Sequence, residues 1–375
     1  MRIGIITLPF LFNYGGIIQA YALQKVLISL GHDVFILEHE SVVPRRLSIK
    51  IRYLIYIKRF VRKYLLGQRD IVIFEDKKNR ERVLRAIQNN RQFIDSHMII
   101  RNFNIDRACE TYNYDCYVVG SDQVWRPKYT NPVEKYFLNF LKPDSPVLRI
   151  AYGASFGTDD WEFSEQQTVT CATLAQRFDL ITVREKSGVT LCERYLHVKA
   201  KQVLDPTMLL DRDDYINIIK KDHIPHHAGN LFVYMLDDNI CKQEFVKKIS
   251  NVLGMSSFSV VPTQLGILGG TVYPGVSSWL RGFFDADFVV TDSFHGCVFS
   301  IIFNIPFVVI GNLSRGQARF DSLLALFNLQ DRLVDVDNMS IRCLSQSINW
   351  IEVNSIWDTM REHSMEILAN ALIDN

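Results

Sequence analysis

The hexapeptide TDSFHG at residues 291–296 places an acid, a hydroxyl and an imidazole between the apolar segments DADFVV and CVFSIIFNIPFVVI. The first segment predicts a buried strand and the second a helix, so the hexapeptide follows the strand's carboxyl end. Asp292 or Ser293 is a natural N-cap, and His295 then lies in the first helical turn, where free N–H groups and the helix dipole favour anions. Gly296 permits close approach of a backbone or ligand. The pattern predicts an anion site with a histidine, and the alternative is a buried core histidine.

The protonation state of His295 decides what chemistry it can perform. A helix N-terminus disfavours the imidazolium by roughly 0.3–2 kcal/mol. A bound dianion about 4 Å away favours it by several kcal/mol at an effective dielectric constant of about 20. We therefore expect His295 to be neutral in the empty site and protonated once an anionic substrate binds, as a general acid requires.

Polar residues at other expected strand ends complete the candidate site. The segment VVGSDQVWRP (118–127) places Asp122 beyond a strand, and ITVREKSG (181–188) leaves Arg184 and Glu185 at another. Arg184 can hold a carboxylate or phosphate in a fork, or it can form a structural ion pair with Glu185. NYGGIIQAYAL (13–23) is a Gly-Gly loop that opens a helix, but it is neither a dinucleotide fingerprint nor a P-loop. Trp125 is a candidate sugar platform, and these loops supply a set of candidate ligand-binding residues: Asn13, Tyr14, Gly15, Gly16, Gln19, Ser121, Gln123 and Trp125.

Composition and motifs exclude several other functions. The 375 residues carry a net charge of +1, which implies neither nucleic acid nor another strongly charged partner. The seven cysteines form no CxxC pair, a pattern typical of reduced thiols in a cytosolic protein. HIPHH (223–227) resembles metal spacing but has no nearby acid or cysteine cluster, so we predict no metal site. Cys297 would face away from His295 on a helix and is not proposed as a nucleophile.

The order of elements predicts an α/β protein with two Rossmann-like domains facing a cleft. Strands are expected at RIGIIT, DVFILE, DCYVVGSD, LRIAYGAS, LITVRE and KQVLDP, and a second series at LFVYML, FSVVPT, DFVVTDS and PFVVIG. We expect an N-terminal domain over residues 1–212, a polar joint, a C-terminal domain over 228–345, and C-terminal helices over 346–375 that return to the first domain. The N-terminal segment MRIGIITLPFLF is a core strand rather than a signal peptide, and no apolar run is long enough to span a bilayer.

A basic helical insert is expected over about residues 45–98. Residues 41–69 hold nine Arg and Lys residues and no acid. On a helix, one face carries Arg52, Lys58, Arg59, Arg62 and Lys63, and another carries Tyr53, Ile57, Phe60 and Tyr64. A basic amphipathic helix indicates contact with a membrane surface or an anionic ligand, whereas packing on its own domain is the alternative.

Taken in order, these segments resemble the polysaccharide pyruvyl transferase family. The resemblance runs through NYGGIIQAYAL, VVGSDQVW, AYGASFG, TVREKSG, VLDPTMLL and TDSFHGCVFSIIFNIPFVVI to ARFDSLLALFNL, which covers most of the chain. It implies a fold similar to GT-B glycosyltransferases. It also implies transfer of the enolpyruvyl group of phosphoenolpyruvate to two sugar hydroxyls, giving a cyclic ketal and phosphate, with no further cofactor.

The resemblance also implies roles for individual residues. His295 matches the family's essential histidine and Arg184 an arginine needed for the donor, while Arg319 in ARFDSLL is a further anion contact. Ser293, Phe294, Gly296 and Glu185 complete the donor side, and Asp122 or Glu185 is the expected base. The loop residues named with Trp125 above form the acceptor side. One departure is Ser293, because some members carry an arginine there, so one donor contact must come from elsewhere.

Two other functions fit the same sequence. A nucleotide-sugar glycosyltransferase would use the same fold with a UDP- or CMP-type donor, and a catalytically silent carbohydrate-binding protein would be indifferent to His295 and Arg184. For the pyruvyl transferase we expect a cytoplasmic location with peripheral contact at the inner membrane face, where acceptors linked to lipid diphosphates or nucleotides are available.

Overall fold

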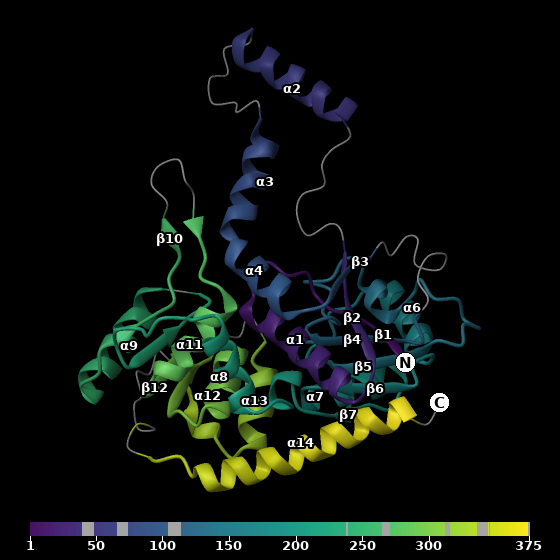
Figure 1. The fold of residues 1–375 in the computed structure, drawn as a ribbon. Coiled ribbons are helices and arrows are strands. Elements are labelled where there is room, and N and C mark those ends of the chain that lie inside the picture. The colour runs from purple at the N-terminus through teal and green to yellow at the C-terminus, as the bar shows by residue number, and fades with distance from the viewer. Residues whose placement is uncertain are drawn as a thin grey trace.

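The computed structural model describes residues 1–39, 49–65, 74–103, 114–237, 239–264, 271–311, 316–335, 344 and 346–373. Figure 1 shows two α/β units side by side, each built on a parallel sheet. The predicted fold class, with two Rossmann-like units facing a cleft, is therefore confirmed, and the cleft is described with the site below.

The first unit holds a seven-stranded sheet in the order β3-β2-β1-β4-β5-β6-β7. All of its paired strands are parallel. Their bounds are β1 Arg2–Ile6, β2 Asp33–His39, β3 Ile100–Phe103, β4 Cys116–Asp122, β5 Leu148–Ala154, β6 Leu180–Val183 and β7 Lys201–Gln202. Every residue of β4 and β5 is buried, as expected for central strands covered by helices on both faces. Of these strands, β3 escaped prediction because its sequence, IRNF, lacks an apolar run.

Helix α1 (Tyr14–Ser29) links the first sheet to the second unit. Its apolar residues are buried nearly all round, and Gly31, with φ of 90°, follows its end as predicted. Tyr14 stacks on Trp279 of the second unit, with ring centroids 5.8 Å apart, and donates a hydrogen bond to Pro274 O. The other helices of the first unit are α2 Ile49–Tyr64, α3 Glu75–Ala86, α4 Gln88–His97, α6 Glu165–Ala175 and α7 Lys186–Leu191.

The second unit holds a five-stranded parallel sheet in the order β14-β13-β12-β8-β9. Its strands are β8 Leu231–Tyr234, β9 Ser257–Phe258, β12 Phe288–Thr291, β13 Phe307–Ile310 and β14 Leu333–Val334, and a separate antiparallel hairpin pairs β10 Thr263–Gln264 with β11 Thr271–Val272. The helices are α8 Arg212–Lys221, α9 Ile240–Leu253, α11 Val276–Asp285, α12 Phe294–Ile302 and α13 Ala318–Leu326. The stretch predicted as a polar joint contains α8, which buries Tyr215, Ile218 and Ile219.

The long C-terminal helix α14 (Trp350–Ile373) runs along both units (Figure 1). Trp357 donates its indole N–H to Met208 O at 2.7 Å, and the Leu204 N–H donates to Ser364 Oγ at 3.1 Å. Both partners follow β7, so the helix reaches back to the first unit. In the described part of the chain, no helix is long and apolar enough to cross a membrane.

The hydrogen bond between Leu204 and Ser364 allows the packing of α14 against the first unit to be tested. Ser364→Ala would leave the buried Leu204 N–H without its acceptor, so we expect the free energy of unfolding to fall by about 1–3 kcal/mol. Thr359→Ala on the same helix is the control, because Thr359 is exposed and its hydroxyl donates to Ser355 O of its own helix. Urea unfolding of both variants measures the difference, and equal effects would contradict a stabilising role for the contact.

Candidate functional site

His295 lies in the first turn of α12, directly beyond β12, as predicted. Ser293 is the N-cap and its Oγ accepts a hydrogen bond from the Gly296 N–H at 3.4 Å. Asp292 is not the cap, because its carboxylate accepts from Lys242 Nζ at 2.5 Å and from the Leu236 N–H at 2.6 Å. The hydrogen bonds of Ser293 and Asp292 therefore hold the β12–α12 turn in place, and this fixes the orientation of the His295 imidazole.

The start of α1 in the first unit lies against His295. A Cβ built on Gly15 would lie 2.0 Å from His295 Nδ1, far closer than any real contact, so only glycine fits at this position. A Cβ on Gly16 would lie 2.9 Å from the Asn13 amide nitrogen, at the end of a side chain. The Gly-Gly loop thus allows the N-termini of two helices from different units to meet at one imidazole.

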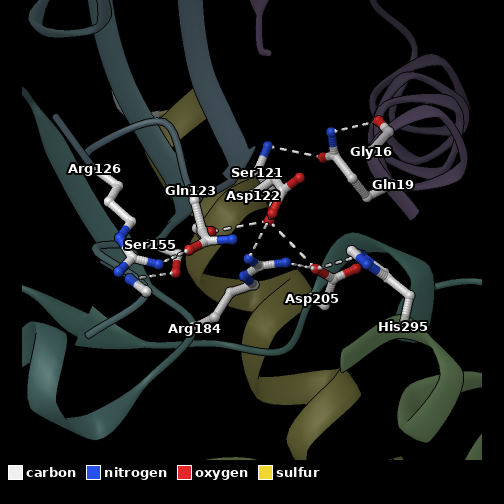
Figure 2. A network of polar contacts seen from close by, with 12 residues as sticks. Gly16, Gln19, Ser121, Asp122, Gln123, Arg126, Ser155, Arg184, Asp205 and His295 are labelled. Carbon is white, nitrogen blue, oxygen red and sulfur yellow. Dashed lines mark hydrogen bonds and ion pairs between the residues drawn. The ribbon is translucent and has the colours of Figure 1, made fainter. Parts of the chain in front are cut away.

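Behind His295, Arg184 is enclosed by two carboxylates (Figure 2). Its Nη1 lies 2.5 Å from Asp205 Oδ2 and its Nη2 lies 3.1 Å from Asp122 Oδ1. All three side chains are at most 3% exposed. The predicted alternative pairing with Glu185 is wrong, because Glu185 instead accepts from the backbone N–H groups of Phe156 and Gly157.

This network changes the pKa values of its members in opposite directions. Burial alone would raise the pKa of Asp205 and of Asp122, but Arg184 and His295 outweigh it and lower both values. Burial lowers the pKa of Arg184, and the two carboxylates more than compensate and raise it. The three groups therefore remain ionised at neutral pH as one buried cation between two anions.

Asp205 was missed by the sequence analysis as a site residue, although it lies in VLDPTMLL. Its Oδ1 accepts from the Thr207 N–H at 3.0 Å and from Thr207 Oγ1 at 2.7 Å. Its Oδ2 lies 3.6 Å from His295 Nε2, a buried nitrogen with no hydrogen-bond partner within the described ranges. An Asp-Pro pair at a strand end was the available signal. Asp205 thus faces the imidazole of the other unit (Figure 2).

A large cavity opens in front of His295, between the two units. Its volume is about 1280 Å³, and both units contribute to its walls. The polar residues facing it include Asn13, Asp122, Gln123, Lys242, Ser293, His295 and Arg319, and its aromatic lining comes from Phe12, Tyr14, Tyr129, Tyr234 and Tyr273. A mostly apolar cavity with a few convergent polar groups is typical of a ligand site.

Arg319 supplies a cation to the cavity from α13. Its guanidinium lies over the Phe294 ring at 5.3 Å, and that of Arg184 lies over the same ring at 4.7 Å. Burial, and then the charge of Arg184, lower the pKa of Arg319 to about 10. It therefore remains protonated at neutral pH, and a bound anion would stabilise that charge.

Several predicted acceptor residues lie in the core instead. Trp125 is fully buried, stacks on Phe137 with centroids 4.7 Å apart, and donates to Tyr136 O, so it cannot be a sugar platform. Gln19 and Ser121 are also fully buried, and the Gln19 amide joins α1 to β4 through the Ser121 N–H. Sequence pattern placed all three near a strand end but could not show the direction of their side chains.

The predicted site residues thus form two groups, those that line the cavity and those that lie in the wall behind it. The cavity brings together Asn13, Tyr14 and Gln123 with four of the predicted catalytic or donor residues, whereas Arg184 and Glu185 lie behind the wall. The four are Asp122, Ser293, His295 and Arg319. Asn13 donates to Asp122 Oδ2 at 3.2 Å, and Gln123 accepts from Arg126. Arg184 is therefore placed to orient the carboxylates, with its Nη atoms already engaged.

The remaining candidates have structural partners. His226 and His227 both contact Asp285, which also binds Arg281. Within the described ranges, no three potential ligands cluster in a way that could hold a metal ion. Cys297 is buried in the core, and burial raises the pKa of its thiol.

The comparisons with known proteins agree with this architecture. Residues 13–314 match the model of a protein family described as polysaccharide pyruvyl transferase. UDP-GlcNAc 2-epimerase from Neisseria meningitidis, bound to UDP-GlcNAc, superposes with a TM-score of 0.50 at 11% identity, covering 100% of each chain. Arabidopsis thaliana UGT89C1 complexed with quercetin gives a TM-score of 0.48 at 9% identity, covering 98% of each chain. The fold is GT-B-like, as predicted. No curated protein matches the sequence.

Removal of the central cation gives a pH-dependent prediction. Arg184→Met would leave two buried carboxylates unpaired, so we expect about 3–5 kcal/mol lower stability at pH 7. In the wild type both carboxyls have folded pKa values below the ordinary 3.8, so their stabilisation is present above that pH and is lost as the pH falls through the folded values.

The difference between wild type and Arg184→Met should therefore shrink as the pH is lowered from 7 towards about 4, because the unpaired carboxyls take up protons. Urea unfolding across this range measures it. Arg126→Met is the control, since Arg126 pairs with Glu162, whose side chain is 30% exposed. A difference that does not change with pH would contradict the assignment.

The contact between the two helix N-termini is tested at Gly15. Gly15→Ala should displace the His295 imidazole, because its methyl group would occupy the position of Nδ1. The imidazole NMR resonances of His295, assigned with His295→Gln, should move strongly. Gly16→Ala is the matched control and should move them little. Unchanged resonances in Gly15→Ala would show that the units are not in contact at this point.

Proposed function

Because the chain belongs to the polysaccharide pyruvyl transferase family, we propose that it transfers the enolpyruvyl group of phosphoenolpyruvate to two hydroxyls of a sugar, forming a cyclic ketal and phosphate. The observation that carries the proposal is His295 at a helix N-terminus, facing a cavity that also receives Arg319. Phosphoenolpyruvate brings a carboxylate and a phosphate, which match a helix N-terminus and a guanidinium.

Arg319 supplies the donor-binding cation that Ser293 cannot provide. Ser293 is used as the helix cap, so it offers only a hydroxyl and cannot replace a cation. Arg319 reaches the same cavity from α13 and lies over the Phe294 ring. In the proposal Arg319 holds the donor anion, and Arg184 acts through Asp122 and Asp205 rather than by touching the donor.

The reaction begins with proton transfer from His295 to C3 of the enol, which becomes a methyl group and leaves a cationic centre at C2. One sugar hydroxyl attacks C2; the C2–O bond to phosphate then breaks and the second hydroxyl completes the ketal. Of the two hydroxyl protons, one leaves with the phosphate and the other returns to His295. Asp205, 3.6 Å from His295 Nε2, stabilises the imidazolium that the first step requires.

Asp122 faces the acceptor side of the cavity. Its pKa is lowered, chiefly by Arg184 acting against burial, so it is a weak base and a good hydrogen-bond acceptor at neutral pH. We assign it to orientation of a sugar hydroxyl. We do not assign Glu185 as the base, because its side chain is buried and accepts hydrogen bonds from backbone N–H groups. The aromatic lining takes the place of Trp125 beside the acceptor.

Donor identity is the first test, because it needs no knowledge of the acceptor. Phosphoenolpyruvate should raise the melting temperature of the wild type and of His295→Gln but bind about 10-fold or more weaker to Arg319→Ala, which loses a charge-assisted contact. Lys220→Ala on the exposed side of α8 is the control. Stabilisation by UDP- or CMP-sugars, with no effect of phosphoenolpyruvate, would instead indicate a nucleotide-sugar glycosyltransferase.

Turnover is the second part of the same test. With phosphoenolpyruvate and a panel of sugar acceptors, the wild type should release phosphate and form a ketal methyl group visible by NMR. His295→Gln should lose at least about 100-fold in rate while still binding the donor, because it cannot protonate C3. Near-normal turnover in this variant would refute the role of His295.

A further inference from the structure

Helix α2 leaves one whole face uncovered. Figure 1 shows it at the end of α3, apart from both sheets. Two contacts join it to the start of α3: Arg59 pairs with Glu75 at 3.4 Å, and the Tyr56 ring meets that of Phe74 with centroids 4.9 Å apart. These contacts fix one side of the helix and leave the opposite side to solvent.

From Tyr53 to Tyr64 the uncovered side is apolar. At about 100° per residue its six residues fall within an arc of about 120°. Each of these residues is between 36% and 68% exposed, and a contiguous exposed apolar patch of this kind marks an interaction site. They are Tyr53, Leu54, Ile57, Phe60, Val61 and Tyr64.

The opposite side of the helix carries four cations. Lys58, Arg59, Arg62 and Lys63 lie on the opposite side, over about 140° of arc. The surrounding sequence, residues 41–69, contains no Asp or Glu at all. An apolar face rich in tyrosine and phenylalanine, flanked by cations with long aliphatic stems, is typical of a helix that lies in a membrane interface.

We propose that α2 anchors the protein to an anionic phospholipid surface, with its apolar face inserted at the level of the acyl chains and its cations beside the headgroups. Charge decides between the possible occupants. A second copy of the chain would bring two basic helices together and repel, whereas an anionic bilayer satisfies both the apolar face and the flanking cations.

Helices α3 and α4, which follow α2 in the chain, are hydrogen-bonded to residues that line the cavity. The Tyr273 N–H donates to Ala86 O at the end of α3, and Asn89 donates to Tyr273 O at 2.7 Å. Asn90 in α4 donates to Leu11 O at 2.9 Å. Tyr273 and Leu11 both line the cavity, so the end of α3 that is farther from α2 is joined to the cavity wall.

Anchoring through α2 would therefore turn towards the bilayer the side of the molecule from which α3 extends (Figure 1). If the proposed function holds, this placement favours acceptors that are carried on lipid. The anchoring itself follows from the exposed face and charge of α2 and does not depend on the donor.

Co-sedimentation of the full chain with vesicles tests the anchor. The wild type should bind phosphatidylcholine vesicles that contain phosphatidylglycerol, fail to bind phosphatidylcholine alone, and dissociate as salt is raised. Lys58→Glu/Arg62→Glu and, separately, Leu54→Ser/Ile57→Ser should each lower the partition coefficient about 10-fold or more. Circular dichroism checks that each variant remains folded.

Matched controls lie elsewhere on the surface. Lys220→Glu/Lys221→Glu reverses two exposed charges on α8, and Val169→Ser/Ile351→Ser removes two exposed apolar side chains from α6 and α14. Both should bind vesicles as the wild type does. Three outcomes would overturn the proposal. The controls could lose vesicle binding as much as the α2 variants do, or the wild type could fail to bind vesicles. The third is that the wild type forms a dimer that Leu54→Ser/Ile57→Ser abolishes.

Binding of phosphoenolpyruvate to the α2 variants separates the two proposals. Variants that keep donor binding and lose vesicle binding support the anchor, whatever the reaction proves to be. A wild type that binds vesicles without binding phosphoenolpyruvate would refute the donor and leave the anchor standing.

Discussion

The placement of Arg184 between Asp122 and Asp205 is the interaction on which the rest of the site depends. A buried guanidinium is tolerated only when its charge and its N–H groups are matched, so the ends of β4, β6 and β7 must hold fixed positions relative to one another. The arrangement also fixes the carboxylates. Asp122 is turned towards the cavity and Asp205 towards His295, so one cation orients the groups on either side of it.

The second constraint is the meeting of two helix N-termini. Helices α1 and α12 come from different units, and the absence of a side chain at Gly15 lets the imidazole of His295 reach the first unit. Each helix brings the positive end of its dipole to the same place, and Arg319 adds a full charge. A small dianion therefore finds several favourable partners there, whereas the wider part of the cavity is mostly apolar and leaves room for a larger molecule.

The two sets of cations in the molecule have opposite surroundings. Arg184 and Arg319 are buried next to carboxylates or an aromatic ring, and their effect is confined to the cavity and the wall behind it. The cations of α2 lie on an outer helix whose other face is apolar and exposed. The first set suits a small anion held in a low-dielectric site, and the second suits an extended anionic surface. The hydrogen bonds from Tyr273 and Asn90 connect the two regions.

Sequence alone determined most of the local structure around the site and the identity of the chemical groups. The pattern of apolar residues correctly predicted β1, β4, β12 and the helix after TDSFHG. Such a prediction works because the spacing of buried residues and the capping residue of a helix are set within a few neighbouring positions. It also placed His295 at a helix start. Only the tertiary structure decided which candidate residues face the cavity. Trp125, Gln19 and Ser121 turn into the core, and Asp205, marked in the sequence only by an Asp-Pro pair, comes to face His295. Side-chain direction at a strand end and pairing between distant loops depend on contacts far apart in the chain, and a local pattern carries no information about them.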